Sequence, residues 1–154
     1  MIARQIETQL RKLAKMYPVV TITGPRQSGK TTLAKAVFPE HRYVSLENFD
    51  IRQMAQADPK GFLKSFSAPV IFDEIQRVPE LLSYIQTIVD QDKSCGQYIL
   101  TGSHQPKNEI VVVPSGFVKL ELDPAHEVIN VNNDKLDKIK LIFFIIIKSP
   151  FYLS

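Results

Sequence analysis

One segment of the sequence carries residue types at the spacing that binds phosphate. Residues 24–31 read Gly-Pro-Arg-Gln-Ser-Gly-Lys-Thr and match the Walker A pattern G-x-x-x-x-G-K-[ST] at every fixed position. The glycines let backbone N–H groups curl around phosphate oxygens, and a helix starting there adds its unpaired amides. Lys30 would bring a positive charge to the β- and γ-phosphates, and the Thr31 hydroxyl would ligate Mg²⁺. We call residues 24–31 the phosphate loop and predict that it binds ATP.

The predicted nucleotide-binding residues are those of the loop and the residue after it: Gly24, Pro25, Arg26, Gln27, Ser28, Gly29, Lys30, Thr31 and Thr32. The alternative is a chance match, which average residue frequencies give in roughly one chain of this length in two hundred. The loop also falls between an expected strand and an expected helix, which the mechanism requires. This context favours the functional interpretation.

An acidic pair follows another apolar strand further along the chain. Residues 71–72, Ile-Phe, run directly into Asp73 and Glu74. This resembles the Walker B pattern, in which Asp73 would orient Mg²⁺ and Glu74 would act as the general base on the attacking water. The alternative is that the two acids only cap the next segment. Together with the upstream phosphate loop, the pattern favours a site in which Thr31 and Asp73 hold the metal.

A polar strand end offers a third candidate. Thr101-Gly102-Ser103 closes an apolar strand, and a hydroxyl there would contact the γ-phosphate or the attacking water. An ordinary turn is the alternative, since these residue types are also good turn formers. We favour the functional interpretation, with Ser103 ahead of Thr101. The predicted catalytic residues are therefore Glu74, Asp73 and Ser103.

The elements that position these residues alternate between strand and helix. Short β-branched or aromatic runs predict strands, and apolar spacings of three and four predict helices. The expected strands are 19–23, 43–46, 70–72 and 98–101, and the expected helices are 2–17, 31–38, 51–57, 58–66 capped by Asp58, and one opening at Pro79. This rhythm predicts an α/β fold in which a mainly parallel sheet has helices on both faces.

The overall composition fits one ordinary globular domain. The chain has 154 residues, of which 44% are hydrophobic and 23% charged, which excludes disordered, collagen-like and coiled-coil proteins. A net charge of +3 and a pI of about 9.0 are too small an excess to argue for nucleic acid. The single Cys95 indicates a reducing cytoplasm. The charged N-terminus is no signal peptide, and the apolar run 141–147 is far short of the ~20 residues that span a membrane.

Other polar residues carry weaker indications. We expect Arg26 to brace the loop more than to catalyse. Gln76 and Arg77, after the acidic pair, would reach the nucleotide or a neighbouring subunit, and a solvated loop is an equal alternative. The three histidines, His41, His104 and His126, lack metal-ligand spacing.

The motifs together resemble a known family. The phosphate loop followed by Thr32-Leu33, the run 43–47 (Tyr-Val-Ser-Leu-Glu), the run 71–76 (Ile-Phe-Asp-Glu-Ile-Gln) and the run 99–103 (Ile-Leu-Thr-Gly-Ser) resemble the prokaryotic AAA+ P-loop ATPases that carry a C-terminal domain of unknown function. The resemblance covers about residues 1–105. It implies a three-layer sandwich in which the sensor strand, ending at Thr101 or Ser103, lies between the phosphate-loop and acidic-pair strands.

The rest of the chain departs from that family. We divide the sequence into an ATPase core, residues 1–105, and a divergent segment, residues 106–154, with a remnant fifth strand at 117–122. Phe117 stands where the family has an arginine. From residue 130 onward, 16 of 25 residues are Asn, Lys, Ile, Phe or Tyr, which predicts a non-native or poorly ordered tail.

Three functions compete. The first is a truncated, Mg²⁺-dependent ATPase that self-associates and receives the missing arginine in trans, since such an arginine adds about 10³ to 10⁵ in rate. The second is a nucleotide-binding fragment without useful turnover, from a truncated or frame-shifted gene. The third is a nucleic-acid-binding protein, which nothing beyond the pI supports.

Overall fold

The described strands all belong to a single sheet. The computed structural model describes residues 2–103, 117–122 and 128–132. Within these residues six strands form one sheet in the order β2-β3-β4-β1-β5-β6. The strands are β1 (Val19–Gly24), β2 (Arg42–Ser45), β3 (Val70–Asp73), β4 (Tyr98–Ser103), β5 (Val118–Leu122) and β6 (Val128–Asn132). All neighbouring pairs are parallel except β5 and β6. Strand β4 thus lies between β1 and β3, which confirms the expected place of the sensor strand.

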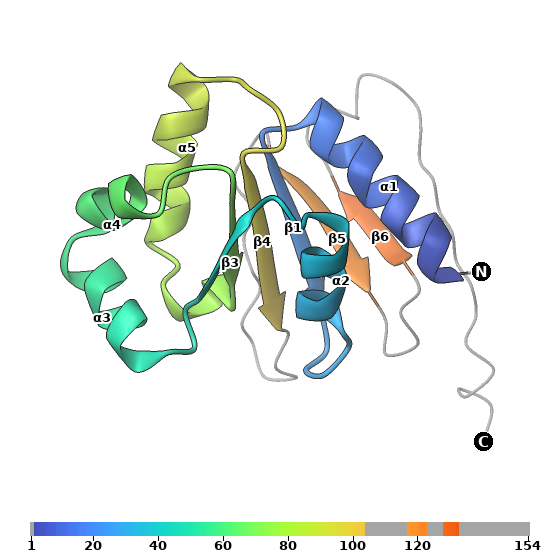
Figure 1. Cartoon of the computed structure of the whole chain (residues 1–154), viewed down its shortest axis with the longest axis horizontal. Coiled ribbons are helices and arrows are strands. Elements are labelled where there is room, and N and C mark those ends of the chain that lie inside the picture. The colour runs from blue at the N-terminus through green and yellow to red at the C-terminus, as the bar shows by residue number, and fades with distance from the viewer. Residues whose placement is uncertain (1, 104–116, 123–127, 133–154) are drawn as a thin grey trace.

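Helices cover both faces of this sheet. The described helices are α1 (Ile2–Met16), α2 (Lys30–Val37), α3 (Phe49–Ala57), α4 (Pro59–Ser65), the short 3₁₀ helix η1 (Ile75–Arg77) and α5 (Leu81–Gln91). Helices α1 and α2 pack on one face, and α3, α4 and α5 pack on the other (Figure 1). The result is a three-layer α/β sandwich. None of the helices in the described ranges is long and apolar enough to cross a membrane.

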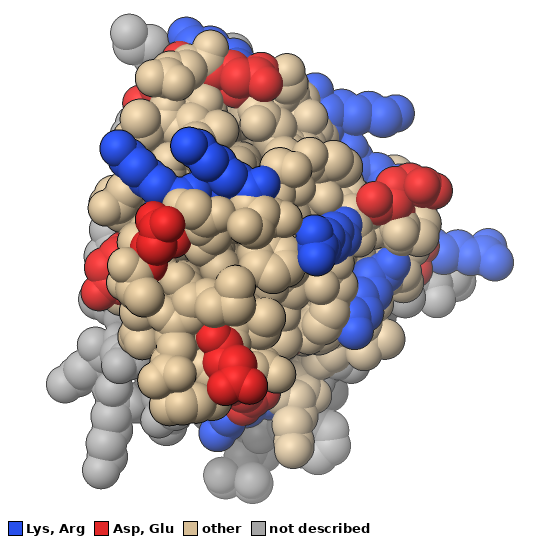
Figure 2. Space-filling model, turned by 60° about the vertical axis from the view of Figure 1, so that its left-hand side comes forward, with Lys and Arg blue, Asp and Glu red and all other residues tan. Residues whose placement is uncertain are grey.

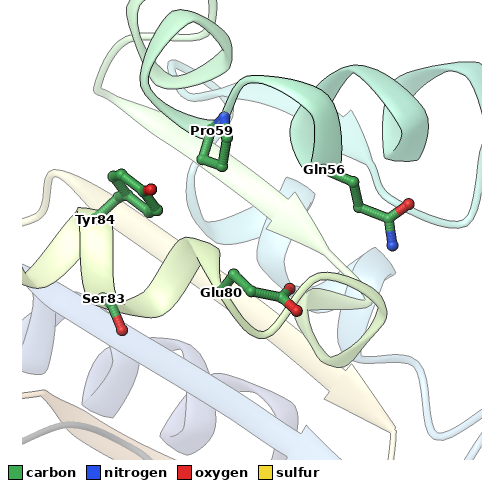
Figure 3. A pocket seen from close by; sticks show the side chains of 5 residues that line it. All are labelled: Gln56, Pro59, Glu80, Ser83 and Tyr84. Atoms are coloured by element: carbon green, nitrogen blue, oxygen red, sulfur yellow. The ribbon is translucent and has the colours of Figure 1, made fainter.

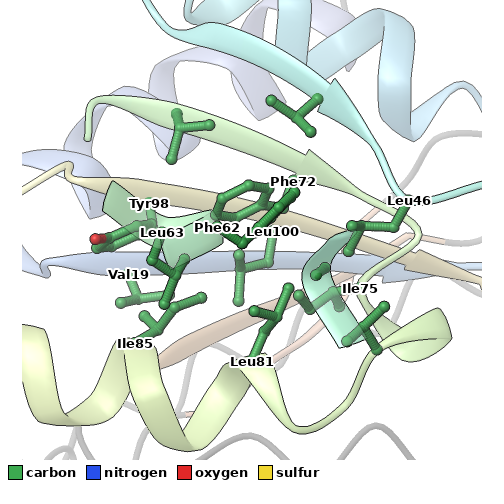
Figure 4. Close-up of a cluster of buried hydrophobic side chains, with 14 of the residues drawn as sticks. Val19, Leu46, Phe62, Leu63, Phe72, Ile75, Leu81, Ile85, Tyr98 and Leu100 are labelled. Carbon is green, nitrogen blue, oxygen red and sulfur yellow. The ribbon is translucent and has the colours of Figure 1, made fainter. Parts of the chain in front are cut away.

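Alternating side chains on the central strands fill two separate cores. In β3, Val70 and Phe72 belong to the cluster under α4 and α5, whereas Ile71 between them belongs to the cluster under α1 and α2. Tyr98 and Ile99 of β4 divide in the same way. Figure 4 shows the first of these clusters. Continuous apolar runs of this kind are typical of parallel strands buried on both faces, and they hold the strand ends in fixed positions.

Local capping sets the helix starts, with one correction to the sequence prediction. The Asp58 side chain accepts a hydrogen bond of 3.0 Å from the Gly61 N–H, which confirms it as the cap of α4. The helix expected to open at Pro79 begins instead at Leu81. The reason is a tighter turn, because the Leu81 and Leu82 N–H groups donate to carbonyls only three residues back.

The segment after β4 is described only in part. Strand β5 pairs with β1, and Val118 lies opposite Val20. Phe117, just before it, is buried in the cluster under α4 and α5. Strand β6, which extends into the compositionally biased segment from residue 130, was not predicted. His104, residues 106–116, His126 and the tail from residue 133 lie outside the described residues.

Candidate functional site

The carboxyl ends of β1, β3 and β4 meet at one edge of the sheet. Gly24, the last residue of β1, lies opposite Ser103, the last residue of β4. Asp73 ends β3, which runs parallel to β4. The phosphate loop, the acidic pair and the polar strand end therefore emerge together, at the edge where parallel α/β sheets bind ligands. Three segments that are far apart in the sequence form one candidate site.

The phosphate loop turns from β1 directly into α2. Gly29 precedes the helix with a φ of 75°, in the left-handed region where a side chain would be strained. Lys30 is the first helical residue, and its side chain folds back into the loop. Its Nζ donates hydrogen bonds to the Pro25 carbonyl oxygen and, at 3.1 Å, to Ser28 Oγ. The loop is thus closed around a buried ammonium group.

Lys30 is an unusual lysine because it is only 4% exposed. Burial lowers its pKa, and the nearby carboxylates of Glu74 and Asp73 oppose that shift. The site therefore places one buried cation close to two carboxylates. A phosphate bound here would give the ammonium a further anionic partner and would stabilise its charged form.

The Asp73 carboxylate accepts hydrogen bonds from three hydroxyl groups, each on a different element. Thr31 Oγ1 of α2 donates to its Oδ1 at 2.8 Å, and Tyr43 of β2 donates to its Oδ2 at 2.7 Å. Thr101 Oγ1 of β4 also donates to Oδ1. The carboxylate is 6% exposed and is held in one orientation. An ionised carboxylate beside a threonine hydroxyl is a set of hard oxygen donors, so Thr31 and Asp73 fit the chemistry of Mg²⁺.

Glu74 combines a strained backbone with a fixed side chain. Its φ of 59° and ψ of 49° place it in the left-handed region; among the described residues only Gln27 shares a positive φ without being glycine. Such a conformation costs of the order of 1 kcal/mol and persists where the surroundings enforce it. Ser103 Oγ donates to Glu74 Oε1 at 2.7 Å, and Gln76 Nε2 donates to Oε2. Both strained residues thus lie in the candidate site.

A cluster of three charged residues lies beside the loop. Glu47 Oε1 is 3.5 Å from Arg26 Nη2 and 4.0 Å from Arg77 Nη2. Glu47 follows β2, and Arg77 ends η1, which follows the acidic pair. The structure therefore links the phosphate loop to the ends of the two neighbouring strands through exposed side chains.

The structure brings most of the predicted site residues together. Within the described residues, no side-chain hydrogen bond is seen for Gln27 or Thr32, and both side chains are exposed. The contacts of Tyr43 and Glu47 with the site were not predicted. The sequence signal was weak, because a tyrosine in a short strand reveals its partner only once the sheet order places β2 beside β3.

A separate hollow lies between the helices of the α3–α5 layer. It has a volume of about 560 Å³ and is lined by Gln56, Pro59, Glu80, Ser83 and Tyr84 (Figure 3). None of these residues belongs to the predicted site. On the face turned toward the viewer in Figure 2, Lys and Arg side chains are interspersed with Asp and Glu, so that face has no continuous basic surface for nucleic acid.

Comparison with known protein families decides the class of this fold. The sequence pattern of the AAA domain matches residues 16–116. The chain belongs to the AAA domain family. This range includes every predicted site residue, and the family fits the observed strand order of a P-loop ATPase-like core. The AAA domain therefore has a nucleotide-binding ATPase-like fold.

Individual relatives are similar over the same part of the chain. An uncharacterized protein of Mycobacterium tuberculosis and one of Mycobacterium bovis are each 34% identical over 106 residues, which is 67% of this chain. The chain spans 24% of the length of these relatives. Among solved structures, a DNA replication initiation factor matches 79% of this chain and 46% of its own, with 21% identity and a TM-score of 0.46. PCH-2 of C. elegans matches 82% of this chain and 39% of its own, with 17% identity and a TM-score of 0.37.

Proposed function

We propose that this AAA domain binds ATP with Mg²⁺ and hydrolyses it. The observation that carries the proposal is the 2.8 Å hydrogen bond from Thr31 to Asp73, which joins the phosphate loop to the acidic strand. It supports a shared role for two residues that lie 42 positions apart. The Walker A and Walker B segments, which were assigned from the sequence alone, would then bind the same Mg²⁺–ATP complex.

Each side chain has a distinct part in this proposal. Lys30 and the N–H groups of the phosphate loop hold the β- and γ-phosphates, and Thr31 and Asp73 hold the metal ion. When bound, Mg²⁺ neutralises phosphate charge. Glu74 accepts a proton from a water molecule whose oxygen bonds to the γ-phosphorus, while the bond from that phosphorus to the β–γ bridging oxygen breaks. ADP and inorganic phosphate leave. Ser103 keeps the Glu74 carboxylate in position.

Two further parts of the proposal concern the surroundings of the domain. We propose self-association of the domain, and its test is the oligomeric state in solution with and without ATP and Mg²⁺. We also propose a reducing cytoplasm as the compartment, because Cys95 is an exposed free thiol.

The second candidate function is nucleotide binding without useful turnover. The observation that favours it is the engaged state of Glu74, whose two carboxylate oxygens already accept hydrogen bonds from Ser103 and Gln76. Each of these bonds occupies a lone pair of its oxygen, so fewer acceptor sites remain for the water molecule that Glu74 would activate.

Steady-state hydrolysis of ATP separates the two candidates. The parent chain should turn over ATP, and Glu74→Gln should lower the rate by about 10²-fold or more, the scale of a lost general base. The matched control is Glu40→Gln, an exposed residue between α2 and β2 at the far end of the sheet. A weak rate that is equal in the parent and in Glu74→Gln would reject the enzyme and leave the binding protein.

A further inference from the structure

The inference concerns the source of positive charge at the γ-phosphate, and it rests on the proposed function. An arginine in this position stabilises charge that develops on the transferred phosphoryl group. Phe117, which stands where the resembling family has an arginine, is buried at the start of β5. Val118 beside it pairs with Val20, near the start of β1, whereas the phosphate loop begins at the other end of β1. A side chain at position 117 is therefore remote from the phosphate loop of its own chain.

Two arginines do lie at the correct edge. Arg26 belongs to the phosphate loop itself, and Arg77 follows the acidic pair in η1. Their guanidinium groups share one partner, since Glu47 Oε1 lies 3.5 Å from the first and 4.0 Å from the second. The three side chains together carry a net charge of +1, so one positive charge in the cluster has no described counter-ion.

The position of Lys30 indicates which phosphate Arg26 would meet. The Lys30 ammonium donates to the carbonyl oxygen of Pro25, the residue directly before Arg26. If Lys30 binds the terminal phosphates, the backbone of Arg26 lies next to the same phosphates. Its guanidinium extends toward Glu47, on the side of β2 and β3. The Arg77 guanidinium lies on that side as well, because its Nη2 is 4.0 Å from the same Glu47 carboxylate oxygen.

The present partner of the two arginines is easily displaced. The side chains of Arg26, Glu47 and Arg77 are 57%, 59% and 38% exposed. Ion pairs this exposed contribute little stability, with a median between 0 and about 1 kcal/mol. A nucleoside triphosphate carries more negative charge than one carboxylate, and guanidinium groups bind phosphate oxygens in bidentate geometry. The γ-phosphate would therefore compete well against Glu47.

We propose that Arg26 and Arg77 bind the γ-phosphate of ATP in cis and that Glu47 holds them in place before the nucleotide arrives. The domain then carries its own arginines for hydrolysis and does not depend on a second copy for them. The ligand that distinguishes this role is the γ-phosphate, because ADP lacks it and still engages Lys30 through its β-phosphate.

The test compares two ligands in the chain of residues 1–154. Affinities for ADP and for a non-hydrolysable ATP analogue, both with Mg²⁺, are measured by calorimetry in the parent, Arg26→Ala, Arg77→Ala and Glu47→Gln. The arginine variants should bind the ATP analogue at least about tenfold more weakly than the parent does, while their affinity for ADP should change less than about twofold. Glu47→Gln should raise the affinity for the ATP analogue, because it removes the carboxylate that competes with the γ-phosphate for the two arginines. Arg11→Ala, an exposed arginine on α1, is the control and should change neither affinity.

The outcomes also separate this proposal from the one it rests on. If the parent binds neither ligand, both proposals fall. A second outcome is that the parent binds both ligands, that Lys30→Ala binds neither, and that each arginine variant loses affinity for ADP and for the analogue by the same factor. In that case the arginines only brace the loop, and this proposal alone is overturned. Unchanged affinities in both arginine variants overturn it too. A hydrolysis rate per molecule that is independent of protein concentration supports arginines acting in cis, and a rate that rises steeply with concentration contradicts them.

Discussion

The phenol of Tyr43 donates a hydrogen bond of 2.7 Å to Oδ2 of Asp73. The two residues end up together because β2 pairs in parallel with β3. Burial, followed by the hydrogen bond to Asp73 and the charge of that carboxylate, raises the pKa of Tyr43 to about 12. The Lys35 ammonium lies 3.5 Å from the centroid of the same ring. Tyr43 therefore fixes one oxygen of the proposed metal-holding carboxylate, and its own position is supported from α2.

This contact predicts a specific loss of stability in alkali. The unfolded chain ionises Tyr43 near its ordinary pKa of 10.0, whereas the folded chain retains the proton up to about pH 12. Between these values the unfolded state binds fewer protons, so the free energy of unfolding must fall as pH rises. Tyr43→Phe should make that decline shallower. Urea unfolding of both proteins at several pH values between about 8 and about 11 measures the slopes.

The comparison contains its own control. Tyr98, whose pKa burial also raises, is present in both proteins and contributes equally to both slopes. Below about pH 9 the two curves should run parallel, because the phenol is neutral in the folded and the unfolded state alike. Equal slopes above about pH 10 would show that Tyr43 does not retain its proton in the folded chain.

The hydrogen bond from Ser103 to Glu74 predicts a selective loss of turnover. Ser103→Ala removes the 2.7 Å donor to Glu74 Oε1 and leaves every described contact of Lys30 in place. We expect kcat to fall about tenfold while ATP affinity stays within about twofold. Ser103→Thr keeps the hydroxyl and should recover most of the rate. Ser83→Ala, an exposed serine of α5, is the matched control. Loss of nucleotide binding in Ser103→Ala would instead mean that the serine shapes the loop.

The outer strands predict a separation between stability and binding. A chain ended after Leu122 loses β6, which pairs antiparallel with β5, but β1 keeps both of its neighbours, β4 and β5. Compared with a chain ended after Asn132, it should have a lower melting temperature and the same ATP affinity within about twofold. Thermal melting and calorimetry on the two chains provide the measurement. A large loss of affinity would show that β6 supports the phosphate loop through β5.

The parts of the fold that the sequence predicted share a physical cause. The phosphate loop, the acidic pair and the central strands are signalled within a few neighbouring residues, by apolar runs that end in glycines, hydroxyls or acids. The place of β4 between β1 and β3 followed from the resemblance to a known family. The structure confirms that order.

The parts that were missed depend on distant segments. Tyr43 reaches Asp73, and Glu47 reaches Arg26 and Arg77, only because the sheet order sets β2 beside β3. Strand β6 reads Val-Ile-Asn-Val-Asn, and asparagine disfavours strands when judged alone. Pairing with β5 outweighs that preference. The helix predicted from Pro79 starts two residues later because a three-residue turn precedes it.

The most direct test of the central claim is the melting temperature of the chain with and without ATP and Mg²⁺. A ligand at 100 times its Kd adds about 2.7 kcal/mol to the free energy of unfolding, which raises the melting temperature of a domain this size by several degrees. The parent and Lys12→Ala, an exposed lysine on α1, should both show this rise. Lys30→Ala should show none, because the buried ammonium inside the phosphate loop is gone. An unchanged melting temperature in the parent, or an equal rise in Lys30→Ala, would contradict nucleotide binding at this site.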